Sequence, residues 1–502
     1  MAVNRMEEIK AAADGLDVLG RLGQLARGGF DAIGADDLER LKWAGLYVQR
    51  PPEAKRFMLR IRVPGGRLLP GQARAVADLA DELSGGRLDL TTRQDVQLHG
   101  IRIEDVPCAL ARLEQAGLTS VHTCGDTPRN VVACPLDSGV ELAQRITQAM
   151  VGRREFSNLP RKFKVGVSTC AADCVVARIH DVGLRAEGDE RYRVFVGGGL
   201  SVHPRGAVDL GVTVTAARAA DLVAAVAGLF RDAGYRERRD HARLKFLVAD
   251  WGVDRLRSEI EARIPGVLEP AKLLDDSESV GPLDHLGVQP ASEGLSHLGV
   301  AVRAGLLTSR QLAALAAAGG AEVRLTPRQN VLLTSVRGGR LKSVLQDVAR
   351  AGLTADADDW AGCVQTCTGI EFCRRAVVET KAVAAAIVDL LNAAAPLGPR
   401  VRVHLSGCPN SCGQVQLAEI GLVGCRVREG DESRPGFEFW FGARIRADGL
   451  RFAQASGRKV AVEDAPAEVA RLVQAYHESA RDGETFSAFA ERQGWRGPVD
   501  EQ

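Results

Sequence analysis

Cysteine is the residue type in this 502-residue chain that points most directly to chemistry. Four of the eleven cysteines form two short-range pairs, Cys367-x5-Cys373 in CTGIEFC and Cys408-x3-Cys412 in CPNSC. Four thiolates are the number that a [4Fe–4S] cluster requires, and two pairs on separate loops can hold opposite faces of one cube. Structural zinc sites favour two or four residues between paired cysteines. The spacing therefore favours an iron–sulfur cluster, with zinc and incidental buried thiols as the alternatives.

A second Cys-x3-Cys pair, Cys170 and Cys174, lies in the first half of the chain. No Cys-x5-Cys pair precedes it, because the corresponding region offers only Cys124 and Cys134. We therefore expect Cys170 and Cys174 to be a relic of duplication or packing thiols rather than a second cluster. The odd total and the clustered placement favour metal or redox chemistry over a disulfide framework.

Basic residues at the spacing of a β-strand are the second feature. Arg60 and Arg62 alternate in MLRIRVPGG, and Lys162 and Lys164 alternate in NLPRKFKVGV, so each pair shares one strand face. Arg129 follows a proline turn in CGDTPRNV. Unpaired charges within apolar strands are costly, and clustered cations bind and polarise small anions. The pattern indicates an anion pocket, with solvated surface charges as the alternative.

Composition excludes several functional classes. The net charge of +1 rules out a polyanion binder driven by bulk charge. The sequence contains no uninterrupted run of 18 apolar residues, so we expect no membrane span. The start, MAVNRMEEIKAAADG, lacks the features of a signal or transit peptide, so we expect a cytoplasmic protein. The glycine runs 196–200 and 64–66 lack the strand–G-x-G-x-x-G–helix context of a nicotinamide or flavin site. Electrons would then arrive from a separate protein.

The elements that must position these residues come in two copies. LTTRQDVQLHGI (90–101) recurs as LTPRQNVLLTSV (325–336), and AGLTS (116–120) recurs as AGLTA (351–355). FKVGVSTCAADCVVARIHDVGL (163–184) is echoed by VRVHLSGCPNSCGQVQLAEIGL (401–422). Three matched blocks in one order predict two copies of a single α+β unit.

Periodicity predicts the elements of that unit. The first copy reads as a strand (56–63), a helix (70–84), a second strand (87–99) and a second helix (105–117), an order that suggests an α/β sandwich. In the second copy, an alternating strand delivers Cys408 into a Pro-Asn turn. Helical periodicity follows Cys373 directly, which predicts that this cysteine pair lies at a helix N-terminus, where the dipole favours a negative cluster.

The cysteine pairs and the GCPN-x-C stretch at 407–412 resemble the signature of the sirohaem-dependent sulfite and nitrite reductase family, and the likeness spans about residues 20–492. WAGLYVQR (43–50), HARLKFL (241–247) and PLDHLGVQ (282–289) are similar to the ferredoxin-dependent actinobacterial type. The resemblance implies a duplicated α+β fold with sirohaem and a [4Fe–4S] cluster bound between the halves. It also implies a monomer that takes electrons from ferredoxin and reduces sulfite to sulfide with six electrons. Reduction of nitrite to ammonia is the alternative.

The resemblance also divides the chain and gives roles to residues. The implied divisions are an N-terminal helical extension (1–50), a first ferredoxin-like half-domain (51–122), a first sirohaem- and substrate-binding domain (123–265), a linker (266–296), a second half-domain (297–356) and a cluster-binding domain (357–502). The implied cluster ligands are Cys367, Cys373, Cys408 and Cys412, and Cys412 also ligates the sirohaem iron. The residues implied around the substrate are Arg60, Arg129, Lys162 and Lys164. The residues implied at the sirohaem, together with Cys412, are Arg62, Arg93, Gln94 and Asn410.

Several finer expectations depend on single residues. His99 lies close to the TTRQ loop and either touches the macrocycle or is a satisfied core histidine. Tyr47 and Cys124 match positions that form a covalent Tyr–Cys link in the mycobacterial-type enzyme. Lys164 stands where nitrite-reducing members often have Asn, which favours sulfite as the substrate.

A basic run at residues 236–245 is a candidate docking patch for an acidic ferredoxin, or else a solvated helix face; it contains Arg236, Arg238, Arg239, Arg243 and Lys245. Two other functions stay open. One is an oxygenase that resembles precorrin-3B synthase, against which the retained basic pocket weighs. The other is a zinc-stapled or cofactor-free binding protein.

Overall fold

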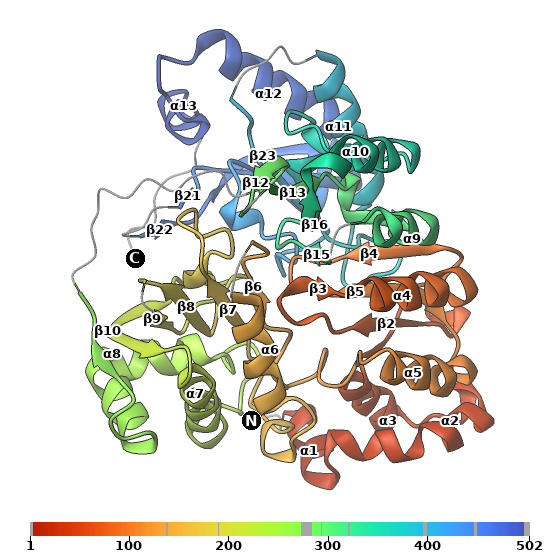
Figure 1. Ribbon diagram of the computed structural model, residues 1–502, viewed down its shortest axis with the longest axis vertical. Helices are drawn as coiled ribbons and strands as arrows, with labels where there is room; N and C mark the ends of the chain where they lie inside the picture. The colour runs from red at the N-terminus through yellow and green to blue at the C-terminus, as the bar shows by residue number, and fades with distance from the viewer. Residues whose placement is uncertain are drawn as a thin grey trace.

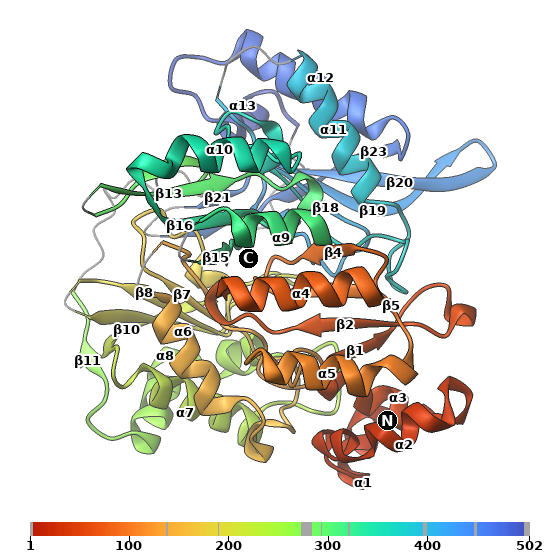
Figure 2. The same cartoon turned by 45° about the vertical axis from the view of Figure 1, so that its right-hand side comes forward.

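The computed structural model describes residues 4–136, 139–188, 190–272, 284–292, 294–319, 322–394, 399–445 and 449–495. Figures 1 and 2 show two similar halves, each with a small half-domain at the centre of the molecule and a larger domain outside it. In Figure 1 the larger domain of the second half (blue) lies above that of the first half (yellow and green), and the two meet where Leu417 clusters with Val176, Ile179 and Leu200.

The N-terminal segment is helical as far as Ala44 and packs against the first half-domain. Its α-helices are α1 (Arg5–Ala12), α2 (Leu22–Gly28) and α3 (Ala35–Arg40). The predicted extension of residues 1–50 therefore ends in sheet structure, because β1 (Leu46–Val48) is the edge strand of the first sheet.

Each half-domain is a five-stranded sheet with two helices on one face. The first contributes β2 (Phe57–Ile61), β3 (Arg67–Leu68), α4 (Pro70–Leu83), β4 (Arg87–Leu90), β5 (Val96–Ile101) and α5 (Val106–Gln115). The second contributes β12 (Gly287–Pro290), β13 (Leu295–Val300), β14 (Leu306–Thr308), α9 (Ser309–Ala317), β15 (Val323–Leu325), β16 (Val331–Arg337) and α10 (Leu341–Arg350). The helices are amphipathic and bury their apolar faces on the sheets.

The two half-domains exchange strands. The sheet orders are β1-β2-β5-β4-β14 and β12-β13-β16-β15-β3, so β14 of the second half completes the first sheet and β3 of the first half completes the second. Helices α4 and α9 pack side by side, and one continuous apolar core runs through both half-domains. This exchange fixes the two halves relative to each other.

The predicted second strand at 87–99 is wrong as a single element. The structure breaks it into β4 and β5 around the turn 91–95. The Thr91 hydroxyl accepts hydrogen bonds from the N–H groups of Arg93 and Asp95, and Gln94 has a positive φ of 58°. A threonine hydroxyl that bonds the following backbone stabilises a turn in place of a ladder.

Each larger domain is a mixed sheet that begins with three parallel strands. The first contains β6 (Val132–Ala133), α6 (Gly139–Met150), β7 (Val165–Ser168), β8 (Val182–Ala186), β9 (Arg191–Val196), β10 (Val208–Thr215), α7 (Ala219–Ala233), α8 (Leu244–Arg263) and β11 (Glu269–Pro270). The second contains β17 (Val364–Thr366), α11 (Lys381–Ala394), β18 (Val403–Ser406), β19 (Ile420–Glu429), β20 (Glu432–Phe441), β21 (Arg444–Ile445), β22 (Leu450–Arg451), β23 (Gln454–Ala461), α12 (Ala465–Ser479) and α13 (Phe486–Arg492).

The parallel strands β6, β7 and β8 correspond to β17, β18 and β19. They are buried on both faces, as parallel strands usually are. Their carboxyl ends carry the cysteines: Cys367 directly follows β17, and Cys408 lies two residues after β18. The strands therefore fix where each ligand loop begins.

The predicted linker (266–296) contains ordered structure at both ends. Strand β11 pairs with β10 in the first domain, and β12 pairs with β13 in the second half-domain. Residues 273–283, which include the first two residues of PLDHLGVQ, lie outside the described part. The boundaries between domains stay a prediction. Within the described ranges, no helix is long and apolar enough to span a bilayer.

Candidate functional site

Four cysteines from two loops of the second domain converge at the interface with the first half. Burial, with nearby Cys412 and Cys373 acting in the same direction, raises the pKa of Cys367 to about 12. Burial also raises the pKa of Cys408, with Cys412 and Cys373 again acting in the same direction. Like charges disfavour ionisation only when they are close. The four thiols that the sequence singled out therefore form one constellation.

Backbone N–H groups are directed at these sulfurs. The Gly407 N–H donates to Cys367 Sγ at 3.1 Å, and the Asn410 N–H lowers the pKa of Cys408. Asn410 thus acts on the cysteine constellation through its backbone, while its side chain is exposed. Such N–H···S hydrogen bonds stabilise negative charge on cluster thiolates.

The predicted helix start after Cys373 is wrong by several residues. Helix α11 begins only at Lys381, because the preceding segment turns back on the CPNSC loop, where the Val377 N–H donates to the Gly407 carbonyl at 2.8 Å. The residue before α11, Thr380, donates to the Cys367 carbonyl at 2.8 Å. The helix N-terminus therefore lies against Cys367 and not Cys373.

The spacing of the four sulfurs argues against a single zinc ion. Among the described residues, no three of them lie within 4.8 Å of one another. A tetrahedral ion with Zn–S bonds of about 2.3 Å would hold its sulfurs about 3.8 Å apart. A cubane places its thiolates on separate corners and needs a wider set. The geometry fits the [4Fe–4S] expectation.

A basic pocket from the first half meets this constellation at Cys412, the exposed cysteine of the four. Arg60 at the end of β2 and the two lysines before β7 each lie within electrostatic range of Cys412. Burial, Arg243 and Arg161 lower the pKa of Lys162 to about 7. Burial and Lys162 lower the pKa of Lys164 well below its usual value. Lys162 and Lys164 precede β7 and Arg62 follows β2, so the expected strand faces are wrong in extent, but Arg60 and the two lysines converge on Cys412.

Three further arginines, Arg62, Arg93 and Arg129, lie within electrostatic range of one another and also donate hydrogen bonds to the protein itself. Arg62 donates to the Pro128 carbonyl at 3.0 Å, and Arg93 donates to the Val165 carbonyl at 3.2 Å. Arg129 donates to the carbonyls of residues 123 and 125 at 2.8 and 2.7 Å. These arginines therefore shape the loops as well as charging the pocket.

Buried donors without partners indicate that the pocket is built for anions. In the described protein, one guanidinium nitrogen of each of these four arginines is buried and unbonded: Arg60 Nε, Arg62 Nη1, Arg93 Nε and Arg129 Nε. Burial lowers the pKa of Arg93 to about 9 and that of Arg62 to about 10, although nearby Asp95 opposes both shifts. Unsatisfied buried cations are costly. Carboxylates of a bound cofactor and an anionic substrate would satisfy them.

Gln94 does not fit its predicted role at a cofactor. It is fully buried, and its amide NH₂ donates to the carbonyls of Leu325 and Ala133 at 2.7 and 3.0 Å. Its oxygen accepts from the Ala133 N–H at 2.8 Å. The repeat partner Gln329 makes the reciprocal bond, to the Leu90 carbonyl at 2.7 Å. Gln94 therefore connects the two halves, because it bonds Ala133 in the first and Leu325 in the second.

His99 has protein partners of its own. It is buried, lies 3.4 Å from Asp89 and stacks on Phe372 at 4.2 Å between ring centroids. Phe372 belongs to the CTGIEFC loop, and Asp89 also faces Lys381 at 3.6 Å. His99 therefore supports the loop that carries Cys373. Neither of its ring nitrogens has a hydrogen-bond partner in the described part of the protein, so contact with the macrocycle and the core-histidine alternative both stay predictions.

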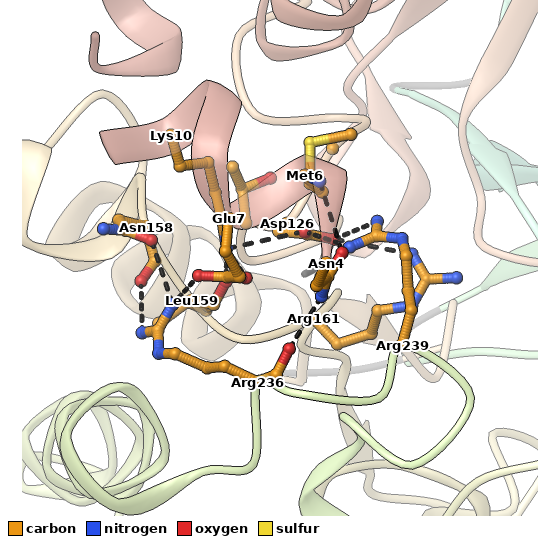
Figure 3. A network of polar contacts seen from close by, with 12 residues as sticks. Asn4, Met6, Glu7, Lys10, Asp126, Asn158, Leu159, Arg161, Arg236 and Arg239 are labelled. Atoms are coloured by element: carbon orange, nitrogen blue, oxygen red, sulfur yellow. Dashed lines mark hydrogen bonds and ion pairs between the residues drawn. The ribbon is translucent and has the colours of Figure 1, made fainter. Parts of the chain in front are cut away.

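Asp126, which the sequence analysis missed, anchors the loop that carries Cys124 and Arg129. It is fully buried and accepts two hydrogen bonds from Arg239 at 2.8 and 2.9 Å (Figure 3). Arg161 and Lys10 approach it at 3.4 and 3.6 Å. Its place in a Gly-Asp-Thr-Pro turn gave no signal, because the cations come from three distant segments.

This network overturns the docking patch expected at 236–245. Arg239 binds Asp126, and Arg236 binds Glu7 and Asn158 (Figure 3). Arg243 is buried on Asp181, and Lys245 is buried against backbone carbonyls. Only Arg238 is mainly in solvent, paired with Asp240. The run is also not a helix face, because α8 begins only at Leu244.

We expect Asp126→Asn to destabilise the protein by about 3 to 5 kcal/mol at neutral pH, since three cations lose a buried counter-charge. Burial opposes ionisation of Asp126, but Arg239, Lys10 and Arg161 prevail and lower its pKa. The stabilisation is therefore present above the unfolded pKa of about 4 and is lost as the pH falls through the lower folded value. Urea unfolding of both proteins across this range measures it. Asp240→Asn, at an exposed pair, is the control, and equal losses for both variants would contradict the prediction.

Tyr47 and Cys124 both lie within electrostatic range of Arg60, so both border the pocket. The covalent link between them stays a prediction.

Comparison with known proteins decides the family. The profile of the nitrite and sulphite reductase 4Fe-4S domain matches residues 124–267 and again 362–498. The profile of the nitrite/sulfite reductase ferredoxin-like half domain matches residues 49–116 and 288–351. The chain belongs to the nitrite and sulphite reductase family. The double match to each profile confirms the duplicated α+β fold.

Relatives in this family match along nearly the whole chain. Sulfite reductase [ferredoxin] 1 of Mycolicibacterium paratuberculosis is 34% identical over 98% of this chain and 95% of its own. Ferredoxin–nitrite reductase of Synechococcus elongatus is also 34% identical, over 92% and 94%. The structure of the NirA protein of Mycobacterium tuberculosis superimposes with a TM-score of 0.93 at 31% identity, over 99% and 98% of the two chains.

Proposed function

We propose that this protein is a ferredoxin-dependent reductase that converts sulfite to sulfide with six electrons, using sirohaem and a [4Fe–4S] cluster. The observation that carries the proposal is the convergence of Arg60, Lys162 and Lys164 from one half on Cys412 from the other. A cysteine constellation for a cluster and a pocket for an anion thereby share one site. Relatives named as a sulfite reductase and as a nitrite reductase, both ferredoxin-dependent, support the proposal.

The donor set fits both cofactors. Cys367, Cys373, Cys408 and Cys412 would hold the cluster, and the unpaired nitrogens of Arg62 and Arg93 would receive carboxylates of sirohaem. When bound, the two cofactors would supply electrons one at a time for the reduction of the substrate. Relatives named as ferredoxin-dependent point to ferredoxin as the donor.

The residues of the pocket bind the anion and deliver protons. Arg60 and Arg129 provide charge that does not titrate near neutral pH. Lys162, with a pKa of about 7, can release a proton near neutral pH, as a general acid requires. An arriving anion raises the pKa of both lysines, because opposite charge favours the ammonium form. Substrate binding and proton uptake are thus linked, which suits a reduction that consumes protons with electrons.

Sulfite is favoured over nitrite by charge. Sulfite exchanges between its monoanion and its dianion near neutral pH, whereas nitrite is only a monoanion. Two adjacent ammonium groups therefore stabilise sulfite more, because they favour its dianion. Identity does not separate the alternatives, since a sulfite reductase and a nitrite reductase are each 34% identical. Lys164 is the residue that bears on the choice.

We expect the wild-type enzyme to show the higher kcat/KM with sulfite when both substrates are measured with reduced ferredoxin. Lys164→Asn should reduce kcat/KM for sulfite about tenfold or more relative to nitrite, because one charge-assisted contact is worth about 1.5 to 3 kcal/mol. Lys164→Arg, which keeps the charge, is the matched control. A wild-type preference for nitrite would change the proposed substrate to nitrite but would not contradict the proposed site residues. An unchanged ratio in Lys164→Asn would show that Lys164 does not set it.

A further inference from the structure

Three cysteines of the first domain and one histidine come together outside the site described above. One ligand atom each from Cys134, Cys170, Cys174 and His285 lies within 4.8 Å of all the others. Cys134 Sγ and His285 Nε2 are 3.9 Å apart. Cys134 and Cys174 are buried, and Cys170 and His285 are partly buried. Cys170 and Cys174, which we expected to be relics or packing thiols, thus lie beside Cys134 and beside a histidine more than 100 residues away.

The three cysteines occupy the positions of cluster ligands in the other half. Cys134 directly follows β6 as Cys367 follows β17, and Cys170 follows β7 at the same distance as Cys408 follows β18. The two Cys-x3-Cys loops also share their backbone conformation. Asp173 and Ser411, at equivalent positions, have φ of 46° and 53°, and Val176 and Gln414 have φ of 52° and 61°. A left-handed valine is strained, so the loop is held in a ligand-presenting form.

Local contacts hold this loop in place before any ligand binds. The Cys174 N–H donates to Cys170 Sγ at 3.4 Å, an N–H···S hydrogen bond of the kind that supports metal thiolates. The Asp173 carboxylate accepts from the Ala177 N–H at 3.0 Å and closes the turn. Arg328 is buried within electrostatic range of Cys174 and Asp284. The loop is therefore ordered around Cys170 and Cys174, with a positive charge near Cys174.

We propose that Cys134, Cys170, Cys174 and His285 form a closed structural zinc site. Three thiolates and one imidazole are a set that zinc takes in tetrahedral structural sites, with sulfurs about 3.8 Å apart. The set is compact, in contrast to the wider spacing of the four cysteines of the cluster, and it has no room for a cubane. In place of a fourth cysteine, His285 comes from the segment just before β12. The ion therefore ties the start of the second half to the first domain.

The test is metal analysis of the full-length protein carrying both of its cofactors. We expect one zinc per chain in addition to the iron of sirohaem and cluster. Cys174→Ser and, separately, His285→Gln should lose the zinc and keep the iron and the visible spectrum, with a lower Tm. Cys425→Ser, at a thiol on β19 that belongs to neither set of cysteines, should keep the zinc. Zinc content is measured independently of enzyme activity, so an absence of the proposed reductase activity would not affect this result.

Cobalt provides a second readout that does not depend on variant folding. Growth in cobalt should give a protein with the absorption of tetrahedral Co²⁺ bound by thiolates, after subtraction of the zinc form. No zinc in the wild-type protein, even after equilibration with zinc, would overturn the proposal. So would zinc retained in both ligand variants, or additional iron lost from Cys174→Ser, which would indicate a second cluster.

Discussion

Cys412→Ser should leave the protein without reductase activity above the detection limit and with a loss of both cluster iron and sirohaem. Cys412 is the exposed cysteine of the cluster set and the one that the basic pocket faces. A serine hydroxyl does not ionise at neutral pH and is a poor ligand for iron, so the proposed set that would hold the cluster beside sirohaem loses one ligand. Iron content and the visible spectrum measure the cofactors, and sulfite-dependent oxidation of reduced ferredoxin measures activity.

Cys425→Ser is the matched control for this loss. Cys425 is a partly buried thiol on β19, in the same domain but on a strand that carries no ligand loop residue. Its replacement should leave iron, spectrum and activity at wild-type levels. A Cys412→Ser protein that kept its full iron and its activity would contradict the assignment of the site.

Lys162→Met should lower kcat for sulfite by about a hundredfold or more while retaining both cofactors. Methionine keeps the length and apolar stem of lysine but cannot donate a proton, and general acid catalysis contributes about 10² to 10⁴ in rate. The pKa of about 7 depends on burial and on Arg243 and Arg161. The wild-type rate should fall as the pH rises through this pKa, or through a higher value once cofactor carboxylates and substrate add negative charge. The variant should lack this limb of the pH profile.

The pH profile separates proton donation from simple charge. Lys162→Arg keeps a positive charge that does not titrate, so it should bind sulfite but remain slow, with its main defect in kcat and not in KM. Lys342→Met, on the exposed face of α10, is the control for loss of a lysine elsewhere. If Lys162→Met kept the wild-type pH limb, another group would be the proton donor.

Much of the fold was predictable because the sequence repeats. Matched blocks at 90–101 and 325–336 required two copies of one unit, and apolar periodicity predicted helices such as α4 and α5 within a residue or two. Local signals failed where contacts distant in sequence decide the structure. The turn at 91–95 interrupts an alternating run, and α11 starts late because the segment before it pairs with the CPNSC loop. The sequences of the short strands β3 and β14 do not indicate that the half-domains exchange them.

For the site, the sequence by itself determined the ligand types. Residue identity and short spacing determine which side chains can bind iron and which carry charge. The four cysteines and the alternating cations could therefore be identified from the sequence. Only the tertiary structure decided which of these groups share a site, because partners such as Cys412 and Lys164 are joined by the packing of the two halves. It showed that the amide NH₂ of Gln94 donates to protein carbonyls and that Asp126 holds the loop of Cys124 and Arg129. It also brought His285 to three cysteines that the sequence had left without a partner.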